Sequence, residues 1–545
     1  MDYSALANLL FPDITKTIAD YEKQYPPRNL PEGAVVTRIA PSPTGFVHLG
    51  NLYNAIGERL AHQTGGVFYL RIEDTDQKRE VAGAVEAVID AMNFYGVHFD
   101  EGVTKDGESG AYGPYRQRQR RELYQTVAKS LVLRGLAYPC FCTEEDLSAM
   151  HEAQEAAKEN YGYYGKYAVW RDRPIEDIQS ELEKGTEWVL RFRSEGDANQ
   201  MIPVLDGIRG ELKVQENYTD FVLLKSDGIP TYHFAHVCDD HFMRTTHVIR
   251  DESWLATLPI HVQLFDTLGW QRPVYCHTAT LMKMDGSSKR KLSKRKDPEL
   301  ALSYYHEVGY PQEATWLYLL TVLNSNFEEW HLANPDADSR EFTFSLEKMS
   351  TSGSLFDLEK LDNISKEYLS RQSAEFVYDG LLAWALHYDA ALADRMTKKP
   401  DFFKAAINVG RGGEKPRKDY GNWKDAAAFL SFYDAETFAL VDECPERADG
   451  SMRNEILNRY LDTLSFADTQ EEWFAKVKEL TEELGYAAQP KKYKKNPELY
   501  KGSIVDVTNL LRVALTGRQN APDIREISQV LGEAETRRRL SAYRN

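Results

Sequence analysis

Two stretches of the sequence combine residue types that suit the binding of phosphate. The first, residues 38–50 (RIAPSPTGFVHLG), predicts a strand end, a Pro/Gly loop and the start of a helix that carries His48. Backbone N–H groups at a helix start attract anions, and an imidazole can donate to a phosphate whose charge rises in a transition state. Gly45 and Gly50 lack a Cβ, so a nucleotide can approach the backbone closely. Taken alone, such a short motif is more often an ordinary loop with a surface histidine.

The second stretch, residues 288–297 (SKRKLSKRKD), holds six cations and one anion and predicts a basic loop over 288–296. Mobile lysines suit a triphosphate because each ammonium group supplies a point charge and three donors. Taken alone, a run of this kind is more often a solvated basic loop. Because the first stretch opens one half of a predicted sheet domain and the second closes the other half, the two together predict a nucleotide bound between them.

The elements around these stretches follow the order of a doubly wound α/β domain with a parallel sheet. We expect ligands at the carboxyl ends of its strands, in the loops at 41–50 and 73–76. The alternation of short apolar runs with helical spacing supports this architecture. The expected strands are 34–40 and 67–72, and the expected helices are 51–62 and 81–95.

The remaining segments differ in character. The first residues predict one short amphipathic helix that ends at Pro26, a tyrosine-rich segment with short strands predicts an insertion in the sheet domain, and the sequence beyond residue 300 is helical to the C-terminus. The expected divisions are an extension, the first half of the sheet domain, the insertion, the second half, and two helical regions, at 1–34, 35–137, 138–218, 219–300, 301–370 and 371–545.

Composition limits the class of protein. In 545 residues, 42% are hydrophobic, which supports several packed cores and excludes a largely disordered chain. The formal net charge of −18 argues, as an average, against a nucleic-acid partner, but the cations are concentrated at 288–296 and 411–424 and can still form local patches. Five cysteines do not make a disulfide scaffold. With no long apolar run and no basic leader, we expect a cytoplasmic protein without membrane contact.

Several motifs resemble those of the class I aminoacyl-tRNA synthetases. Residues 41–51 resemble the HIGH motif, and residues 291–295 (KLSKR) resemble the KMSKS motif. The resemblance runs from about residue 34 to the end of the chain, in the family's order and spacing. Further segments look like the bacterial type of glutamyl-tRNA synthetase in particular, at 71–76 (RIEDTD), 220–235 (DFVLLKSDGIPTYHFA), 246–250 (THVIR) and 511–517 (LRVALTG).

The resemblance implies a Rossmann-type catalytic domain, with an inserted acceptor-binding α+β domain at 138–218, a stem-contact region at 301–370 and an all-α anticodon-binding region at 371–545. It implies that the chain activates L-glutamate with ATP and Mg²⁺. The glutamyl group is then transferred to the 3′-terminal adenosine of tRNA(Glu), and the sequence leaves open whether tRNA(Gln) is also a substrate. We expect a monomer.

The resemblance also implies roles for individual residues. His48, Lys291 and Lys294 are expected to stabilise the transition state. Glutamate needs cations for two carboxylates and an anion for its ammonium group, and the expected contacts are Arg38, Ser42, Glu73, Tyr232, His236 and Arg250. His236 replaces the family's usual Asn, and its protonation could change near neutral pH. ATP is expected at Pro41, Thr44, Gly45, His48, Gly50, Asn51, Ser293, Lys294 and Arg295.

For tRNA, the sequence offers cations interleaved with aromatic residues, which suit splayed bases and their phosphates. The expected contacts lie between 411 and 424. The basic clusters at 491–495 and 537–539 are further candidates, although solvated helix faces are the preferred interpretation at 537–539. The expected tRNA-binding residues are Arg411, Lys415, Arg417, Lys418, Trp423 and Lys424.

Many relatives carry a zinc ion in the insertion, held by a C-x-C pair and a later Cys/His pair. This chain has Cys140 and Cys142, but Tyr167 stands where a cysteine is expected. His151 or Tyr163 could contribute, yet two thiolates do not complete a tetrahedral site, so we expect no structural zinc.

Three alternatives stay open at this point. A glutaminyl-tRNA synthetase shares the architecture, although the motifs look glutamyl. A tRNA-modifying paralogue would lack the anticodon region, for which this chain has about 180 residues on the family's plan. A catalytically inactive RNA-binding paralogue is disfavoured by intact His48, Glu73, Arg250, Lys291 and Lys294.

Overall fold

The computed structural model describes residues 2–45, 47–293, 295–411 and 413–544. Lys294, for which a catalytic role is expected, lies outside the described residues. The chain forms two compact units: unit 1 contains Met1–Tyr304 and Trp316–Asp357, and unit 2 contains Tyr305–Thr315 and Leu358–Asn545. The region expected at 301–370 is therefore divided between the two units.

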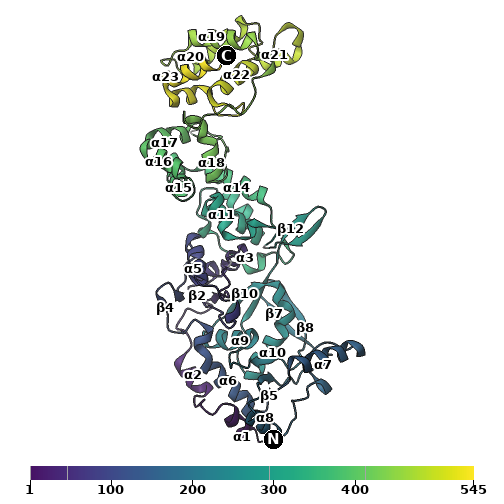
Figure 1. The fold of residues 1–545 in the computed structure, drawn as a ribbon. Coiled ribbons are helices and arrows are strands. Elements are labelled where there is room, and N and C mark those ends of the chain that lie inside the picture. The colour runs from purple at the N-terminus through teal and green to yellow at the C-terminus, as the bar shows by residue number, and fades with distance from the viewer. Residues whose placement is uncertain (1, 46, 294, 412, 545) are drawn as a thin grey trace. The chain divides into compact units, whose positions relative to one another are not determined.

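Unit 1 contains the predicted parallel strands, arranged in two four-stranded sheets (Figure 1). In each sheet three strands run parallel and the fourth pairs antiparallel at an edge. The two sheets meet where the N–H of Thr246 donates to the carbonyl of Val36 over 2.9 Å. The first sheet has the order β1 (Val36–Ile39), β2 (Val67–Leu70), β3 (Glu101–Thr104), β4 (Gly107–Ser109). The second has the order β10 (His247–Asp251), β11 (Val274–Thr278), β7 (Met201–Asp206), β8 (Gly210–Gln215).

Burial explains why these short apolar runs are strands. All four residues of β1 are buried, as expected for parallel strands that are covered on both faces. β2 and β3 extend the first sheet on one side of β1, whereas β10 lies beside β1 on the other side, so the order of the strands changes between β1 and β10. The carboxyl ends of these two strands therefore lie at the switch point where such sheets bind ligands. The connecting helices are α3 (Leu49–Asn54), α4 (Ile56–Gln63), α5 (Ala84–Phe94), α6 (Arg121–Leu133), α9 (Tyr232–Phe242) and α10 (Leu258–Leu268).

The insertion does not follow the expected limits of 138–218. The β7–β8 hairpin lies inside those limits but joins the second sheet, where Asp206 pairs with Tyr275. Strand β9, which lies outside them, pairs with β6 in a separate antiparallel sheet. This sheet has the order β5 (Ala137–Cys140), β6 (Val189–Phe192), β9 (Val222–Leu224), and the helices beside it in sequence are α7 (Glu144–Ala157) and α8 (Ile175–Glu183).

The basic stretch at 288–296 is only partly a loop, which corrects the sequence-based expectation. β12 (Leu281–Asp285) and β13 (Ser288–Lys291) form an antiparallel hairpin. The Asp-Gly step at its turn explains the difference, because Gly286 adopts the positive φ of 61° that tight hairpins require. β14 (Ser354–Leu355) pairs in parallel with β12 and interrupts the otherwise helical sequence beyond residue 300.

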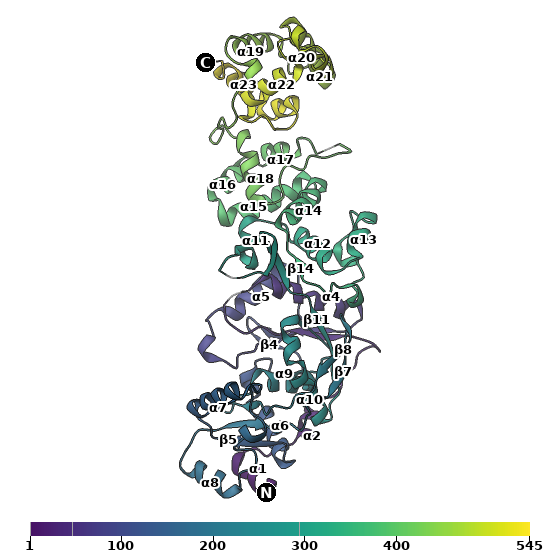
Figure 2. The ribbon, with the colours of Figure 1, turned by 90° about the vertical axis from the view of Figure 1, so that its right-hand side faces the viewer.

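The N-terminal residues form two helices and not the single helix expected. The carboxylate of Asp2 accepts from the first turn of α1 (Tyr3–Leu10), and a second helix, α2 (Ile18–Gln24), begins after Thr17, where the Asp20 carboxylate accepts the N–H of Thr17. Both helices pack on α6, and Leu6 is fully buried. The extension is therefore part of the core of unit 1 (Figure 2).

Three helices follow residue 300: α11 (Leu302–Val308), α12 (Gln312–Leu323) and α13 (Phe327–Ala333). The first two each have residues in both units, and α13 lies in unit 1. Unit 2 confirms the expected all-α C-terminal region, with two hydrophobic clusters. Its further helices are α14 (Leu358–Arg371), α15 (Ala374–Tyr388), α16 (Ala390–Lys398), α17 (Pro400–Asn408), α18 (Trp423–Leu430), α19 (Ser451–Thr463), α20 (Gln470–Glu483), α21 (Pro490–Lys495), α22 (Ile504–Thr516) and α23 (Ile524–Ala542). Across the described residues, none of the helices combines the length and the apolar character that a membrane span requires.

Candidate active site

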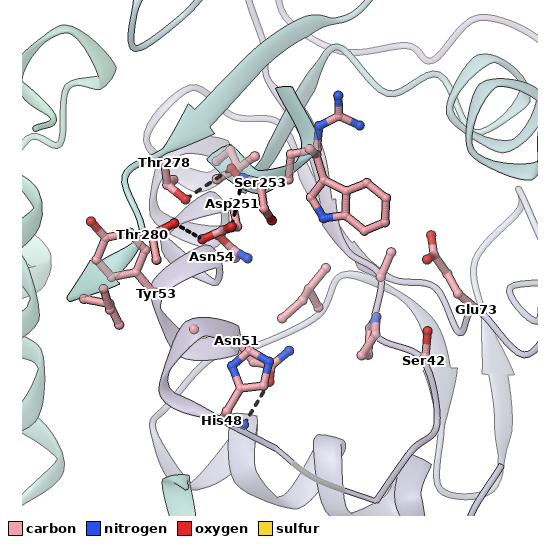
Figure 3. A pocket seen from close by; sticks show the side chains of 18 of the residues that line it. Ser42, His48, Asn51, Tyr53, Asn54, Glu73, Asp251, Ser253, Thr278 and Thr280 are labelled. Carbon is pink, nitrogen blue, oxygen red and sulfur yellow. Dashed lines mark hydrogen bonds between the residues drawn. The ribbon is translucent and has the colours of Figure 1, made fainter. Parts of the chain in front are cut away.

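A cavity of about 610 Å³ opens at the carboxyl ends of β1 and β10 (Figure 3). This volume lies within the range of about 300–1,000 Å³ that is typical of small-molecule sites. Both the loop after β1 and the hairpin that carries Lys291 contribute to its wall, as the sequence predicts. The expected site residues that line it are Arg38, Pro41, Ser42, Thr44, Gly45, His48, Gly50, Asn51, Glu73, Tyr232, Arg250 and Lys291.

His48 stands at the start of α3, between the loop and the helix. Its N–H donates to Oδ1 of Asn51 over 2.9 Å, which fixes the beginning of the helix. A Cβ on Gly50 would lie 2.8 Å from Nδ1 of His48, so the imidazole occupies the space that glycine leaves. Gly45 has a different role, because its φ of +77° is one that residues with a side chain rarely adopt. Both glycines therefore shape the loop itself, in addition to any approach by a nucleotide.

The two motif segments are joined through the backbone. His48 forms an antiparallel bridge with Ala301, and the N–H of Leu302 donates to the carbonyl of Val47 over 3.1 Å. The basic segment ends a few residues before this bridge. Its position relative to His48 is therefore set by a short stretch of chain.

Asp297 organises the end of the basic segment. Its carboxylate accepts from the N–H of Ser293 over 2.8 Å and from the Arg290 guanidinium over 2.6 and 2.8 Å. The Arg290 hydrogen bonds hold the pKa of Asp297 well below its usual range. Lys291 is exposed, with Nζ 3.5 Å from Oδ1 of Asp251. Neither Ser293 nor Arg295, both expected to bind ATP, lines the cavity.

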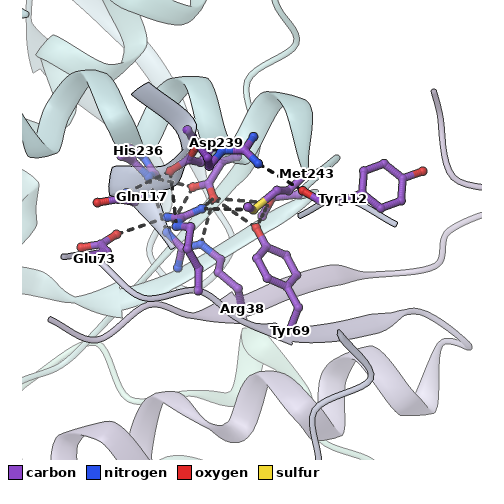
Figure 4. Close-up of polar contacts among 12 residues, drawn as sticks. Arg38, Tyr69, Glu73, Tyr112, Gln117, His236, Asp239 and Met243 are labelled. Atoms are coloured by element: carbon purple, nitrogen blue, oxygen red, sulfur yellow. Dashed lines mark hydrogen bonds and ion pairs between the residues drawn. The ribbon is translucent and has the colours of Figure 1, made fainter. Parts of the chain in front are cut away.

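Arg38 is a buried cation whose charge is already matched inside the protein (Figure 4). Its Nε and Nη2 donate to the two carboxylate oxygens of Asp240, each over 3.1 Å. Arg71 donates to the same carboxylate over 2.6 Å. Burial by itself would raise the pKa of Asp240, but the two guanidinium groups outweigh it and hold the pKa well below the ordinary value.

Glu73 follows β2 and faces the cavity. Oε1 accepts from Nη2 of Arg71 over 3.2 Å. Burial raises the pKa of Glu73 above its usual value, against the opposing pull of Arg71 and Arg38. An anion that is poorly compensated at a cavity wall favours a cationic ligand.

Arg250, at the end of β10, is held by imidazoles and not by carboxylates. Its Nε donates to Nε2 of His277 over 3.0 Å, and Nη1 lies 3.2 Å from Nδ1 of His261. The guanidinium also lies over the ring of Tyr275, 4.6 Å from its centre. Nη2 is buried and has no hydrogen-bond partner among the described residues. Arg250 thus brings a cation with an unused donor to the cavity wall.

His236 does not reach the cavity, which differs from its expected role as a glutamate contact. It is fully buried, with its ring parallel to that of Tyr232, 5.9 Å away. Nδ1 lies 2.7 Å from Oδ2 of Asp240, and Nε2 lies 3.1 Å from the hydroxyl of Tyr275. Burial lowers the pKa of His236 to about 3, so the expected change of charge near neutral pH is wrong. Tyr232 itself stacks on Trp254, with ring centres 4.3 Å apart.

Sequence reasoning missed the wall that follows β10 and β11. Oδ2 of Asp251 accepts from the hydroxyl of Thr280 over 3.0 Å, and Oδ1 accepts from the N–H of Ser253 over 3.0 Å. The rule that ligands gather at strand ends could have found these residues, because Asp251 and Ser253 lie at the end of the THVIR strand, and Thr278 and Thr280 lie at the end of β11. The missed lining residues include Asp251, Ser253, Trp254, Thr278 and Thr280.

In unit 2, most of the expected tRNA contacts are engaged within the protein. Nη2 of Arg411 donates to the carbonyls of Leu369 and of Gln372, the latter over 2.9 Å. Trp423 is only 8% exposed, so its ring cannot stack on a base. Arg417 pairs with Asp419 over 2.6 Å, and Lys418 pairs with Glu367. Lys415 and Lys424 are exposed.

The basic cluster at 537–539 is also only partly as expected. Arg537 and Arg538 pair on the helix surface with Glu533 and Glu535. Arg539 is buried and donates to the carbonyls of Phe432 and Leu515 over 2.5 and 2.6 Å. The preferred interpretation of a solvated helix face is therefore wrong for Arg539.

In the insertion, the C-x-C pair meets a tyrosine. The sulfur atoms of Cys140 and Cys142 each lie 3.5 Å from the hydroxyl of Tyr163. Among the described residues, no group of three or more His, Cys, Asp or Glu side chains could hold a metal ion. His151 instead lies edge-on to the ring of Tyr161, 5.5 Å away.

Comparison with known proteins identifies the family. The family model of the catalytic domain of tRNA synthetases class I (E and Q) matches residues 34–363, and that of the anticodon binding domain matches residues 423–544. The chain is 53% identical to the glutamate–tRNA ligase of Acetivibrio thermocellus, covering 99% of both chains. It is 48% identical to the glutamate–tRNA ligase of Clostridium perfringens strain SM101, over 100% of both chains.

A solved structure agrees over nearly the whole length. The crystal structure of a glutamate tRNA ligase from Elizabethkingia meningosepticum in complex with its amino acid superposes with a TM-score of 0.74 and 28% identity, covering 93% of this chain and 98% of that one. With both family models and full-length relatives in agreement, the chain belongs to the glutamate–tRNA ligases of the class I aminoacyl-tRNA synthetases.

Proposed function

We propose that this chain joins L-glutamate to tRNA(Glu) at the expense of ATP, through a glutamyl-adenylate. The observation that carries the proposal is the pairing of charges at the cavity wall: Arg250 offers a buried donor that has no partner within the described part of the chain, and Glu73 offers a carboxylate with a raised pKa. A free amino acid presents the complementary groups, a carboxylate and an ammonium. The second carboxylate of glutamate explains why the cavity also has Arg38 on its wall.

The proposed glutamate contacts are Arg38, Ser42, Glu73, Tyr232 and Arg250, all of which line the cavity. The Asp240 pair occupies Nε and Nη2 of Arg38, so its contact with a ligand is limited to Nη1. Among the described residues, the hydrogen bonds of the Arg250 guanidinium go to imidazoles and to no carboxylate, and we assign it the larger share of the attraction for a substrate carboxylate. Glu73 is assigned the ammonium group.

Activation is a transfer of the adenylyl group. The α-carboxylate of glutamate attacks the α-phosphate of ATP in line, a new C–O–P link forms, and pyrophosphate leaves with the bonding electrons. Such reactions gain most of their rate from positioning and from the stabilisation of charge. His48 and Lys291 line the cavity and are proposed to stabilise the phosphates in the transition state, with Lys294. Mg²⁺ that arrives with ATP would supply further neutralisation of charge.

Transfer follows when a ribose hydroxyl of the 3′-terminal adenosine attacks the carbonyl of the mixed anhydride. AMP leaves, and an ester to the tRNA forms. We propose that the 2′-hydroxyl is the attacking group. No residue of the chain is acylated in this scheme.

The remaining parts are assigned by the same proposal. The inserted sheet of β5, β6 and β9, with α7 and α8, would contact the acceptor end of the tRNA, the residues of 301–370 that lie in unit 1 its stem, and the helices of 371–545 the anticodon. The match of residues 423–544 to an anticodon binding domain supports the last assignment. The protein is proposed to act as a monomer in the cytoplasm.

We also propose that the insertion needs no zinc ion. Tyr163 stands against both sulfur atoms of the C-x-C pair, and two thiolates with one phenol leave a tetrahedral site incomplete. Metal analysis of the dialysed protein tests this proposal. Stoichiometric zinc, together with a drop in melting temperature on chelation, would contradict it.

Pyrophosphate exchange tests the proposed activity. The assay measures ATP formed from labelled pyrophosphate with tRNA present, and it compares glutamate, glutamine and aspartate. We expect exchange with glutamate, and its loss in His48→Ala. Preferential exchange with glutamine would instead favour a glutaminyl-tRNA synthetase, which has the same class of catalytic domain. Exchange with none of the three amino acids, in a protein that binds tRNA, would favour an inactive RNA-binding paralogue.

A further inference from the structure

The surroundings of the two cavity arginines differ in one respect that the proposed activity does not explain. Arg38 is neutralised by the carboxylate of Asp240, whereas the Arg250 guanidinium is hydrogen-bonded to two histidines, His277 and His261. A carboxylate partner would hold a guanidinium equally well, but it would also cancel the charge that attracts the substrate. A neutral imidazole orients the guanidinium and leaves its charge available.

The hydrogen bond from Arg250 to His277 depends on which ring nitrogen of His277 carries the proton. Nε of Arg250 is always a donor, so Nε2 of His277 must accept and must be unprotonated. The proton therefore lies on Nδ1, where Oδ2 of Asp206 accepts it over 2.6 Å. Burial lowers the pKa of His277 against the opposing effect of Asp206, which favours the neutral ring. Asp206 thus selects the tautomer that Arg250 needs.

Asp206 is itself held in place by the turn of the β7–β8 hairpin. Its Oδ1 accepts from the N–H groups of Ile208 and Arg209, over 3.0 and 2.9 Å. The Arg209 side chain then donates to the carbonyl of His277 over 3.1 Å and to Oε2 of Glu252 over 2.5 Å. The turn therefore binds His277 twice, through its backbone carbonyl by Arg209 and through its ring by Asp206. This arrangement exceeds what is needed to satisfy one buried imidazole.

We infer that Asp206 and His277 are positioning residues for the amino-acid substrate, acting through Arg250. Asp206 fixes the tautomer of His277, and His277 aims the Arg250 guanidinium so that Nη2 faces the substrate carboxylate. Neither residue lines the cavity, and neither takes part in the chemistry. The inference rests on the proposed function, because it presupposes that Arg250 binds glutamate.

The chain offers informative substitutions. In Asp206→Asn, the amide oxygen is needed by the turn N–H groups, so the amide N–H₂ faces Nδ1 of His277 and drives its proton to Nε2. Two donors then meet at Arg250, and the bond is lost. His277→Gln keeps an acceptor near the position of Nε2, whereas His277→Phe keeps the planar ring and has no acceptor. Asp197→Asn is the matched control, because Asp197 also caps a turn in this part of the chain, with Asn199, but is exposed, and its side chain has no hydrogen bond to a histidine among the described residues.

The experiment measures KM for glutamate, KM for ATP and kcat in pyrophosphate exchange, with tRNA present, together with the melting temperature. For Asp206→Asn and His277→Phe we expect KM for glutamate to rise about 10- to 100-fold, the range for a hydrogen bond to a charged group, with KM for ATP changed by less than about threefold. His277→Gln should recover most of the loss, and Asp197→Asn should match the wild type.

Each other outcome is decisive. A KM for glutamate that stays at the wild-type value in folded Asp206→Asn and His277→Phe overturns the inference, and so does an equal loss in His277→Gln and His277→Phe. Should Asp206→Asn fail to fold, the two His277 variants decide alone. A wild-type protein without glutamate-dependent exchange overturns the proposed function first, and the inference with it. This outcome is distinguished from the others because it appears before any substitution is made.

Discussion

The imidazole of His48 lies in the space beside the backbone of Gly50. A Cβ on Gly50 would stand 2.8 Å from Nδ1 and 2.9 Å from Cε1 of the ring, distances that real side chains do not tolerate. The glycine in the HLG segment is therefore matched to the histidine two residues earlier. His48 can keep its position at the cavity wall only because Gly50 has no Cβ.

Gly50→Ala should consequently displace the imidazole while leaving the helix intact. We expect kcat for pyrophosphate exchange to fall about 10²- to 10³-fold, the range for losing one donor to a transition-state charge, and to approach the value of His48→Ala. Gly413→Ala is the control, because a Cβ there meets only the Lys415 nitrogen, at 4.0 Å. Wild-type kcat in Gly50→Ala would contradict a role for the ring at its present position.

The raised pKa of Glu73 predicts how glutamate binding depends on pH. Protonation of Glu73 removes its attraction for an ammonium group, so KM for glutamate should rise as pH falls from neutrality through the raised pKa of Glu73. In Glu73→Gln, KM should be raised about 10- to 100-fold at neutral pH and should lose this dependence.

The melting temperature of Glu73→Gln shows whether its higher KM comes from the lost carboxylate or from a less stable protein. Because the folded protein disfavours ionised Glu73, this group lowers stability as pH rises through its folded-state pKa. Glu73→Gln should therefore melt no lower than the wild type at neutral pH. A lower melting temperature, or a KM with the wild-type dependence on pH, would contradict the assignment of Glu73 to the ammonium group.

Asp240 should be a determinant of stability and not of chemistry. Asp240→Asn leaves the buried guanidinium groups of Arg38 and Arg71 without their shared counter-charge, and we expect a loss of about 3–5 kcal/mol in the free energy of unfolding in urea. The pKa of Asp240 is depressed in the folded state, so its contribution is present above the ordinary carboxylate pKa and is lost as pH falls below it.

The difference from the wild type should accordingly stay constant from about pH 7 to about pH 5 and shrink below about pH 4. Asp177→Asn supplies the comparison, because its pair with Arg173, at 3.5 Å, is exposed on both sides. Equal stability of the two variants would show that the buried cluster is not what holds β1, β2 and α9 together.

The exposed lysines of α21 are now better candidates for RNA contact than the residues at 411–424. Lys491, Lys492, Lys494 and Lys495 are exposed, and no ion pair engages them within the described part of the chain. Replacing all four by Gln should raise KM for tRNA at least about tenfold and flatten its salt dependence, with kcat unchanged. A control removes four lysines of unit 2 that already pair with carboxylates, namely Lys366, Lys398, Lys404 and Lys476. If KM for tRNA rises equally in the two quadruple variants, the effect comes from the loss of positive charge and not from the position of the α21 lysines.

Much of the catalytic fold was predictable, because its signals are local. The apolar run before Pro41 and the Gly/Pro loop predict β1 and the site loop within a few residues, and the helical spacing that follows predicts one helix over 51–62, which the structure divides into α3 and α4 at Ala55. The clustering of the loop residues with Glu73, Tyr232 and Arg250 at one cavity follows from the rule that parallel strands end together.

The wrong predictions concern side chains whose surroundings are set by residues far away in the sequence. An aromatic residue beside lysines predicts a base-stacking group at Trp423. Nothing near it in the sequence shows that the backbone of Gly309 and the missing Cβ of Gly380 make room for its ring inside the protein. The sequence predicts Arg411 as a tRNA contact, whereas its guanidinium donates to the carbonyls of Leu369 and Gln372 at the end of α14. The sequence predicts His236 in the pocket, whereas its ring stacks against Tyr232 and its Nδ1 contacts the buried carboxylate of Asp240.

The most direct test of the central claim is the charging of tRNA by the purified wild-type chain. Transcripts of tRNA(Glu) and tRNA(Gln) are incubated with ATP, Mg²⁺ and either labelled glutamate or labelled glutamine, and the aminoacyl ester is separated on acid gels. We expect a base-labile glutamyl ester on tRNA(Glu), no ester with glutamine, and no product from His48→Ala. An ester formed from glutamine in preference to glutamate, or no ester on tRNA(Glu) from folded protein, would contradict the claim.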